Sequence, residues 1–322
     1  MESRTLGRTG LTVSRVCLGT MTFGAQVDEA AAAAMVDYCL ERGVSFIDTA
    51  NVYNAGGSET ILGKVLRGRR DQVVLATKVG LKMDEEPGGS GLSAAAIRRG
   101  IEDSLRRLQT DFVDLYYLHQ PDYTVPLEES LGAMDRLVQE GKVRFVGASN
   151  YASWQVCRML WLAERNGWQP VQVVQPMYNL IARSAEAEFL PMCRDFGLAV
   201  AAYNPLAGGL LTGKHTGAAP LAGTRFDRMP TYRDRYWHSA NFDAVRELSA
   251  IARTAGRSLI SLALGWLLHH TAADCVILGA SSLEQLKENL AAAEEGPLAA
   301  ETVAACDRVW KALRGVSPPY NR

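Results

Sequence analysis

Short runs of β-branched and aromatic residues recur along the chain and are separated by longer segments with helical periodicity. The apolar runs predict strands at 15–21, 45–50, 73–78, 112–119, 144–150, 171–178, 198–205 and 274–281. Apolar residues at helical spacing predict helices at 28–42, 58–66, 93–108, 127–140, 153–166, 185–196 and 242–255. Because no Pro/Gly-rich linker or change of composition interrupts the alternation, it predicts one α/β domain over residues 1–322. The expected fold is a single (β/α)8 TIM barrel.

Two segments fall outside this alternation. Residues 4–14, "RTLGRTGLTVS", predict a short hairpin around a glycine turn that closes the floor of the barrel. The segment 204–241, after the seventh strand, is too long for a simple connection, and such loops are usually functional or disordered.

Polar residues stand where the predicted strands end. A single polar strand end is most often a turn former or a cap. In a (β/α)8 barrel, however, the carboxyl ends of all strands gather around one mouth, where such enzymes place their sites. Seven strands end this way, at Asp48, Lys78, His119, Ser149–Asn150, Gln175, Tyr203–Asn204 and Gly279–Ser281. Helix capping and turn formation alone do not explain so many polar strand ends on one face of the barrel.

Composition and charge narrow the class of protein. The 322 residues are 48% hydrophobic and carry a formal net charge of −1, which predicts neither nucleic acid nor a membrane surface as a partner. The longest apolar run, 259–268, is too short to span a bilayer, and the N-terminus lacks a signal-peptide core, so a cytoplasmic location is expected. The six cysteines and five histidines lack metal-ligand spacing, and no metal site is expected.

Asp48, Tyr53, Lys78 and His119 form a set suited to proton transfer. A tyrosine with its ordinary pKa of about 10 is a poor proton donor near neutrality. A neighbouring ammonium lowers that pKa, so Lys78 is expected to activate Tyr53, with Asp48 holding Lys78. His119 is placed to direct a ring N–H at a substrate oxygen. The set predicts protonation of a carbonyl oxygen, and because no side chain supplies hydride, it also predicts a nicotinamide cofactor.

The sequence resembles the aldo-keto reductases nearly from end to end. The resemblance rests on separated motifs in one order: "FIDTANVYNAGGSETILG", "LATK", "VDLYYLHQPD", "VGASNY", "QPMYN", "YNPLAGGLLTGK" and "ILGASSLEQLKENL". It implies NADPH-dependent reduction of aldehydes and ketones, with Tyr53 as general acid, Lys78 and Asp48 tuning it, and His119 orienting the carbonyl.

The same resemblance implies a cofactor site. Asn150 and Gln175 would bind the nicotinamide carboxamide, and Tyr203 would stack on its ring. The full implied set is Asp48, Ser149, Asn150, Gln175, Tyr203, Asn204, Pro205, Leu206, Gly208, Leu210, Lys214, Arg225, Gly279, Ser281, Gln285 and Asn289.

The expected cofactor site has no Rossmann signature, because no G-x-G-x-x-G follows a strand. The stretch "GGLLTGKH" (208–215) fits G-x-x-x-x-G-K, but His215 stands where a P-loop needs Ser or Thr. We interpret it as a glycine-rich loop whose backbone lies against a pyrophosphate, with Lys214 nearby. A flexible connector is the alternative interpretation.

The stretch "SSLE" opens a predicted helix with Ser281 or Ser282 as N-cap and Glu284 as the partner in a capping box. The free N–H groups of such a helix start suit an adenosine 2′-phosphate. Leu278 and Ala280 flank Gly279, and at these positions many relatives carry Pro and a basic residue. Because this chain has no basic residue there, we expect NADPH to be preferred but NADH not to be strictly excluded.

The long loop carries candidate substrate residues in "TRFDRMPTYRDRYW". Arg228 and Arg233 are predicted to be solvated. The stretches "YRDRYW", "SSLEQLKENLAAAEEGPL" and the terminal "YNR" resemble the aflatoxin-aldehyde and succinic-semialdehyde reductase branch. This implies that Arg235 and Arg322 bind a substrate carboxylate beside Tyr232, and a planar guanidinium suits that role. The expected substrates are small acidic aldehydes such as succinic semialdehyde, dicarbonyls and aflatoxin dialdehyde-like compounds.

Alternatives of other kinds remain. The fold also occurs as a potassium-channel subunit, in which nucleotide occupancy counts for more than turnover. An N-terminal extension would mark that class, and this sequence starts three residues before its predicted hairpin. A sugar, steroid or ketone reductase of the same fold would use acidic aldehydes poorly. The resembling branch is often dimeric, which makes a homodimer a candidate assembly.

Overall fold

Eight parallel strands close into a barrel in the computed structural model, which describes residues 1–83 and 90–316. Their order around the barrel is β10-β3-β4-β5-β6-β7-β8-β9, and β10 pairs with both β3 and β9, so the sheet has no free edge. The strands are β3 (Val16–Gly19), β4 (Phe46–Asp48), β5 (Val74–Val79), β6 (Val113–Leu118), β7 (Val143–Ser149), β8 (Val171–Gln175), β9 (Ala199–Tyr203) and β10 (Cys275–Gly279). The (β/α)8 prediction is confirmed.

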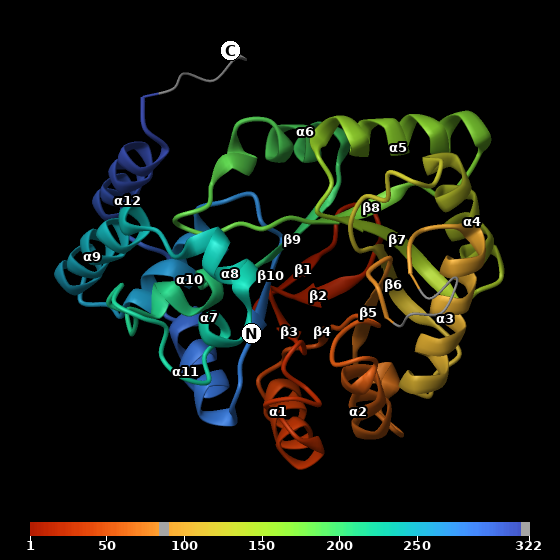
Figure 1. The fold of residues 1–322 in the computed structure, drawn as a ribbon, viewed down its shortest axis with the longest axis horizontal. Coiled ribbons are helices and arrows are strands. Elements are labelled where there is room, and N and C mark those ends of the chain that lie inside the picture. Colours follow the sequence, from red (N-terminus) through yellow and green to blue (C-terminus); the bar gives the residue numbers. More distant parts are fainter. Residues whose placement is uncertain (84–89, 317–322) are drawn as a thin grey trace.

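Helices surround the barrel on all sides (Figure 1). Asp28, Ser93 and Ser258 each cap a helix by accepting a hydrogen bond from a backbone N–H of its first turn. The long helices are α1 (Glu29–Glu41), α2 (Gly57–Val65), α3 (Ala94–Leu108), α4 (Leu127–Gln139), α5 (Ser153–Asn166), α6 (Phe189–Phe196), α9 (Ser239–Thr254), α10 (Leu259–His269), α11 (Leu283–Ala293) and α12 (Ala300–Arg314).

The remaining helical segments are short and lie in connections. They are the 3-10 turns η1 (Arg70–Gln72), η2 (Ser184–Glu186) and η3 (Ala207–Thr212), and the helices α7 (Arg225–Arg228) and α8 (Pro230–Tyr236). The predicted helix 185–196 is therefore wrong in extent, since it divides into η2 and α6 at Glu188, whose φ of −146° is not helical. Pro191 explains the late start of α6, because a proline is tolerated in the first turn of a helix but not in its interior.

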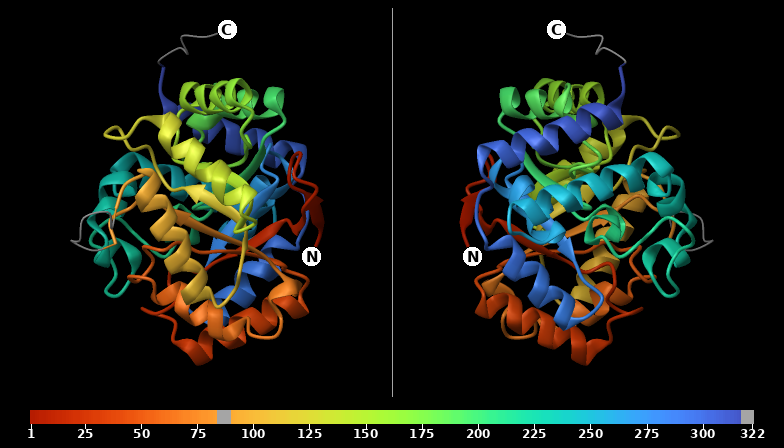
Figure 2. Two further views of the ribbon diagram at one scale, coloured as in Figure 1. Left: turned by 90° about the vertical axis from the view of Figure 1, so that its right-hand side faces the viewer. Right: turned by 90° about the vertical axis from the view of Figure 1, so that its left-hand side faces the viewer.

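A hairpin closes the floor of the barrel, as predicted. Its strands, β1 (Ser3–Thr5) and β2 (Thr12–Ser14), are antiparallel. Leu6 and Val13 are fully buried and join the apolar cluster inside the barrel, which also contains Cys17 and Phe46. Figure 2 shows the hairpin on one side of the barrel and the segment with α7 and α8 on the opposite side. The hairpin therefore covers the end of the barrel that is opposite to the predicted site residues.

Alternation along the strands decides which side chains face the barrel interior. Phe46 and Ala76 belong to the interior cluster, whereas Ile47 and Leu75 belong to the larger cluster between strands and helices. The next interior positions toward the mouth, two residues after Phe46 and Ala76, are Asp48 and Lys78. Within the described ranges, no helix combines the length and hydropathy that crossing a bilayer requires.

Candidate active site at the carboxyl end of the barrel

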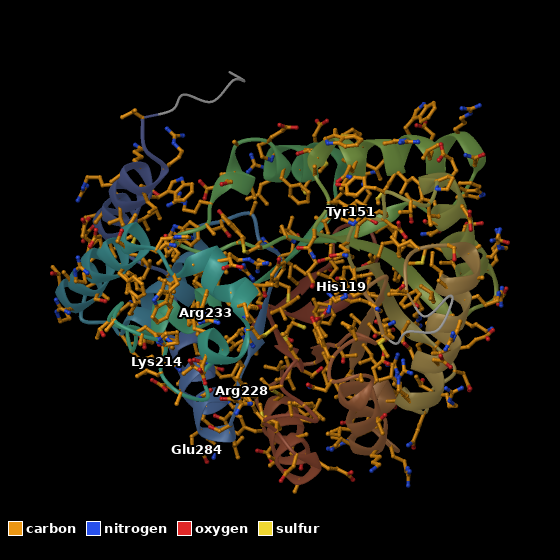
Figure 3. The ribbon with its side chains drawn as sticks, in the orientation of Figure 1. His119, Tyr151, Lys214, Arg228, Arg233 and Glu284 are labelled. Carbon is orange, nitrogen blue, oxygen red and sulfur yellow. The ribbon has the colours of Figure 1, made fainter. Side chains whose placement is uncertain are left out.

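The predicted polar strand ends meet at one mouth. Asp48, Lys78 and Gln175 lie within β4, β5 and β8, and His119 directly follows β6. Ser149 ends β7 and pairs in register with Gln175, and its Oγ donates to the Gln175 carbonyl at 2.9 Å. In Figure 3 the viewer looks into this mouth, with His119 near its centre.

Lys78 is the centre of a buried hydrogen-bond network. Its ammonium donates to Asp48 Oδ1, to the Thr49 carbonyl at 2.6 Å and to the Tyr53 hydroxyl at 3.4 Å. A lysine has three N–H donors, so these three acceptors use all of them. Gln175 Nε2 donates to the other Asp48 oxygen at 2.9 Å, which fixes the carboxylate from the far side. Both Asp48 and Lys78 are buried, so bulk water solvates neither charge.

Burial and ion pairing act in opposite directions on Lys78. Burial lowers its pKa, but the charges of Asp48 and Tyr53 and their hydrogen bonds raise it, and the result is a pKa above the ordinary value. Lys78 is therefore an ammonium at neutral pH. Asp48 is its buried counter-ion, and removal of either partner would leave the other charge uncompensated.

The pKa of Tyr53 differs from the sequence-based expectation. Burial raises its pKa, and although the charge of Lys78 lowers it, the net pKa lies above the ordinary value. The prediction that Lys78 would bring the pKa of free Tyr53 below normal is therefore wrong in net direction, because desolvation of a phenolate outweighs one nearby ammonium. The consequence is a phenol that keeps its proton at neutral pH beside a fixed positive charge.

His119 is held neutral. Burial and the charge of Lys78 lower its pKa to about 3. Its ring lies edge-on to the Tyr53 ring, with centroids 6.0 Å apart and planes at 79°. Among the described residues, its Nδ1 has no hydrogen-bond partner although it is buried. A neutral imidazole next to the Tyr53 phenol can offer one N–H to an oxygen placed between them.

Asn150 and Tyr203 connect the ends of β6, β7 and β9. Asn150 adopts a left-handed conformation with φ of 63°, and its Nδ2 donates to the His119 carbonyl at 2.9 Å. Tyr203 donates its hydroxyl to Asn150 Oδ1 at 2.8 Å. The residues predicted to hold a carboxamide, Asn150 and Gln175, thus have protein partners, and their cofactor contacts remain predictions.

The predicted glycine-rich loop forms η3. Gly208 and Gly209 have φ of 70° and 107°, and Gly208 N donates to Asn204 Oδ1 at 3.1 Å. Lys214 is exposed and lies over Gly209, with its Cε 3.8 Å from the point that a methyl group on Gly209 would occupy. Pro205, which precedes η3, and Leu210 within it are buried, and Leu206 directly precedes η3.

His215 has a structural environment. It is buried, its ring meets Phe226 and Trp237 edge-on at 5.0 and 5.3 Å, and burial lowers its pKa. This aromatic cluster joins η3 to α7 and the end of α8, which agrees with an ordered loop and not with a flexible connector.

The start of α11 has one of the two predicted N-caps, but not the predicted capping box. Ser282 is the N-cap and accepts from Gln285 N, and Gln285 Oε1 accepts from Ser281 N at 3.1 Å. The predicted Ser281–Glu284 box does not form, because the helix begins one residue later, and Gln285 instead accepts from the residue that precedes the N-cap. Of the other predicted contacts here, Gly279 ends β10 and is exposed, and Asn289 is buried on α11.

Tyr232 organises the arginines of α7 and α8. The guanidinium groups of Arg225 and Arg235 lie 5.1 and 5.3 Å from its ring centroid. A methyl group on Gly208 would come within 2.7 Å of Tyr232, so the ring lies directly on η3. Burial raises the pKa of Tyr203, and the positive charge of Arg235 lowers it. Arg235 is therefore close enough to the end of β9 to act on Tyr203.

The other arginines predicted in the loop and at the C-terminus are not part of the group around Tyr232. Arg228 and Arg233 are exposed, as predicted, and Figure 3 shows them with Lys214 to one side of His119. Arg322 lies outside the described residues.

Two contributors escaped the sequence-based prediction. The Thr49 carbonyl accepts from Lys78, and a backbone acceptor leaves no trace in a residue pattern. Tyr236 receives hydrogen bonds from Asn179 at 3.1 Å and from Asn204 at 3.2 Å, tying α8 to the ends of β8 and β9. The stretches "PMYN" and "YNP" follow the neighbouring strands β8 and β9 and could have suggested paired asparagines. They do not reveal that both asparagines bind Tyr236.

Comparison with known proteins agrees with this geometry. A sequence model of the Aldo/keto reductase family matches residues 15–311. The chain is 44% identical to aflatoxin B1 aldehyde reductase member 2 of Homo sapiens, over 95% of this chain and 89% of that protein. It is 42% identical to human aldo-keto reductase family 7 member A3, over 95% and 96%. A probable voltage-gated potassium channel subunit beta of Oryza sativa subsp. japonica is 37% identical, over 92% and 93%. The chain is thus an oxidoreductase-type barrel that belongs to the aldo/keto reductase family.

Proposed function

We propose that the protein is an NADPH-dependent reductase of small aldehydes, including acidic and dicarbonyl ones. The observation that carries this proposal is the Lys78 network. A protonated Tyr53 hydroxyl lies 3.4 Å from an ammonium whose other two donors are already fixed, next to a neutral His119. This arrangement suits delivery of one proton to a carbonyl oxygen.

The mouth also fits a nicotinamide dinucleotide. Asn150, Gln175 and Tyr203 present amide and phenol groups at consecutive strand ends, and would hold the nicotinamide. Gly209 of η3 is left-handed and has only Lys214 within 4 Å of the point where a methyl group would lie, so its backbone and Lys214 would hold the pyrophosphate. The start of α11 would hold the 2′-phosphate through its N–H groups. When bound, the reduced nicotinamide supplies hydride to the carbonyl carbon.

The side chains manage the charge that develops on the carbonyl oxygen. His119 donates an N–H to that oxygen and Tyr53 transfers its hydroxyl proton to it, so that the product is an alcohol. The Tyr53 phenolate that remains is stabilised by Lys78, and Asp48 keeps Lys78 in place. Lys78 thus acts most strongly after the proton has begun to leave, which reconciles its role with the raised pKa of free Tyr53.

Acidic aldehydes are proposed as substrates because of Arg235. Its guanidinium lies on the Tyr232 ring at 5.3 Å and near Tyr203, and because the residue is exposed it would meet a carboxylate at the rim of the mouth. Arg322 is proposed as a second carboxylate ligand on the resemblance alone. The similarity to aflatoxin B1 aldehyde reductases supports the aldehyde class.

The test is steady-state consumption of NADPH and, in parallel, NADH. Succinic semialdehyde, an uncharged aldehyde of similar length and a dicarbonyl would be compared. The proposal expects faster consumption of NADPH with all three substrates, and a lower KM for succinic semialdehyde than for the uncharged aldehyde. Turnover of uncharged aldehydes alone would contradict the acidic-substrate proposal and leave carbonyl reduction standing.

A nucleotide-binding regulatory subunit is the second candidate. The 37% identity to a potassium channel subunit beta supports it. Tight binding of NADPH without turnover of any tested carbonyl would favour this candidate over the reductase.

A further inference from the structure

The start of α2 packs against the outer side of the strand ends that carry the Lys78 network. The helix lies between α1 and α3 on the outside of the barrel (Figure 1). Its second and third residues, Ser58 and Glu59, are fully buried although both are polar. Buried polar side chains normally have hydrogen-bond partners, and the partners of these two lie beside Lys78 and its acceptors.

Ser58 joins the residues that directly follow β3 and β4. Its Oγ donates to the Thr20 carbonyl at 2.9 Å and lies 2.9 Å from the hydroxyl oxygens of Thr20 and Thr49. The Thr20 hydroxyl donates in turn to the Asp48 carbonyl at 3.0 Å. With Thr49 as donor to Ser58, each hydroxyl proton of the cluster is used once. The cluster thus fixes the backbone of Asp48 and Thr49, which supply two of the three acceptors of Lys78.

The start of α2 is also linked to Tyr53. The Ser58 N–H donates to the Tyr53 carbonyl at 3.3 Å. Between them, Asn54 and Ala55 both have φ of 52°. Side chains disfavour this left-handed conformation, so the surrounding contacts must hold the turn in place. A displaced Ser58 would therefore move Tyr53 relative to Lys78.

Glu59 holds the strand that carries Lys78. Its Oε1 accepts from the Thr77 hydroxyl at 2.5 Å, and Thr77 directly precedes Lys78 in β5. Its Oε2 accepts from Arg107 Nε of α3 at 2.8 Å, so the buried carboxylate has a counter-ion. Because neighbouring strand residues point to opposite faces, Glu59 holds the backbone at Lys78 from the outside of the barrel.

From these contacts we propose that Ser58 and Glu59 are positioning residues, which hold Lys78 and its three acceptors at the spacing that proton transfer needs. Both act through the residues they hold, because their side chains lie outside the barrel and not in its mouth. One turn of one helix thereby fixes the ends of β3, β4 and β5 together. The inference rests on the proposed carbonyl reduction, in which Tyr53 donates the proton.

The first measurement is the single-turnover rate of NADPH oxidation with a saturating uncharged aldehyde, which isolates the chemical step. Ser58→Ala removes the shared hydroxyl. Glu59→Gln leaves one oxygen where Thr77 and Arg107 each need an acceptor. Each variant is expected to lower the single-turnover rate about 10- to 100-fold, because small displacements of catalytic groups have effects of that size. KM for the aldehyde should change little.

Ser14→Ala and Asp114→Asn are the matched controls, because they remove equivalent contacts at the opposite ends of the same strands. Ser14 Oγ donates to the Val16 carbonyl at 2.6 Å and accepts from Ser45 N at 3.0 Å, so it joins the starts of β3 and β4. The buried Asp114 accepts from Leu75 N of β5 at 2.9 Å and from an arginine at 2.7 Å. Thermal unfolding verifies that all four variants fold. Both controls should keep the wild-type rate even where their unfolding temperature falls.

A second readout needs no turnover. The ¹³Cζ resonance of Tyr53, identified by its loss in Tyr53→Phe, reports on the hydroxyl that Lys78 contacts. It is expected to move in Ser58→Ala and Glu59→Gln and to stay in place in both controls. A wild type that reduces no carbonyl would contradict the proposed function, and the resonance would still test the positioning. Rates and resonances of Ser58→Ala and Glu59→Gln that equal those of the controls would overturn the inference.

Discussion

Lys78 determines the charge distribution of the site because each of its three donors has an acceptor. Asp48, the Thr49 carbonyl and the Tyr53 hydroxyl are held at once, and Gln175 holds Asp48 in turn. The identity of these side chains was predictable from strand ends. The net pKa of Tyr53 was not, because it depends on how far burial of the phenol exceeds the effect of one ammonium.

His119 gives a prediction for pH dependence. With a pKa of about 3, it stays neutral throughout the physiological range. Carbonyl reduction should therefore show no loss between about pH 8 and about pH 5 that is attributable to an ordinary histidine titrating near 6.5. The measurement is kcat/KM against pH for wild type and His119→Gln. An inflection near 6.5 that is present in wild type and absent from His119→Gln would contradict the assignment.

The same pKa has a consequence for stability. The folded pKa of His119 is lower than its unfolded value of about 6.5, so the unfolded chain binds the proton more readily below that pH. The contribution of His119 to the free energy of unfolding is therefore intact above about pH 6.5. It declines as the pH falls toward 3.

The connection after β9 holds the elements least accessible to prediction. Its length indicated a functional loop, but η3, α7 and α8 are each too short for periodicity to reveal. Tertiary contacts define them instead: His215 packs on Phe226 and Trp237, and Tyr236 ties α8 to two asparagines. The start of α11 shows the same limit, since either of two serines could cap it from sequence and only the structure identifies Ser282.

Arg235→Ala should separate charged from neutral substrates. A hydrogen-bonded charge pair contributes about 1.5–3 kcal/mol, so KM for succinic semialdehyde should rise about 10- to 100-fold while KM for an uncharged aldehyde changes little. Arg233→Ala is the control, because Arg233 is exposed on the same helix and has no proposed contact with the substrate. Equal changes in KM for both substrates would exclude Arg235 as a carboxylate ligand.

Gly208→Ala should disturb the support of Tyr232. Gly208 has φ of 70°, and a methyl group there would lie 2.7 Å from the ring, so the variant combines backbone strain with displacement of the side chain. Gly68 has a similar φ of 75° with open space around it, so Gly68→Ala isolates the backbone cost of about 1 kcal/mol. We expect Gly208→Ala alone to raise KM for NADPH and for acidic aldehydes. Equal kinetics of the two variants would show that Tyr232 needs no support from η3.

The barrel as a whole was predictable because all eight strands have dense apolar runs and the helices between them are long. Four predicted helices, at 28–42, 93–108, 127–140 and 153–166, agree with α1, α3, α4 and α5 to within a residue or so at each end. The floor hairpin was found from its glycine turn. The residue that anchors the hairpin in the core was not predictable, because Leu6 lies at the turn, outside both strands, and only its burial in the structure identifies it.

Leu6→Ala tests the hairpin as part of the core. Leu6 is fully buried in the interior cluster, so its truncation should lower the free energy of unfolding by about 2–5 kcal/mol in urea denaturation. Leu11→Ala, a partly exposed position in the same hairpin, should cost less. A loss below that of Leu11→Ala would mean that the floor does not contribute to the stability of the barrel.

The rate of NADPH oxidation by Tyr53→Phe tests the proposed chemistry most directly. The substitution removes the hydroxyl and keeps the ring, and general acids typically contribute about 10²- to 10⁴-fold to a rate. Tyr123→Phe, at an 83% exposed tyrosine in the β6–α4 connection, is the control. The account predicts a fall in kcat of about that size for Tyr53→Phe, with NADPH binding retained, and none for Tyr123→Phe. Wild-type turnover by Tyr53→Phe would contradict the central claim.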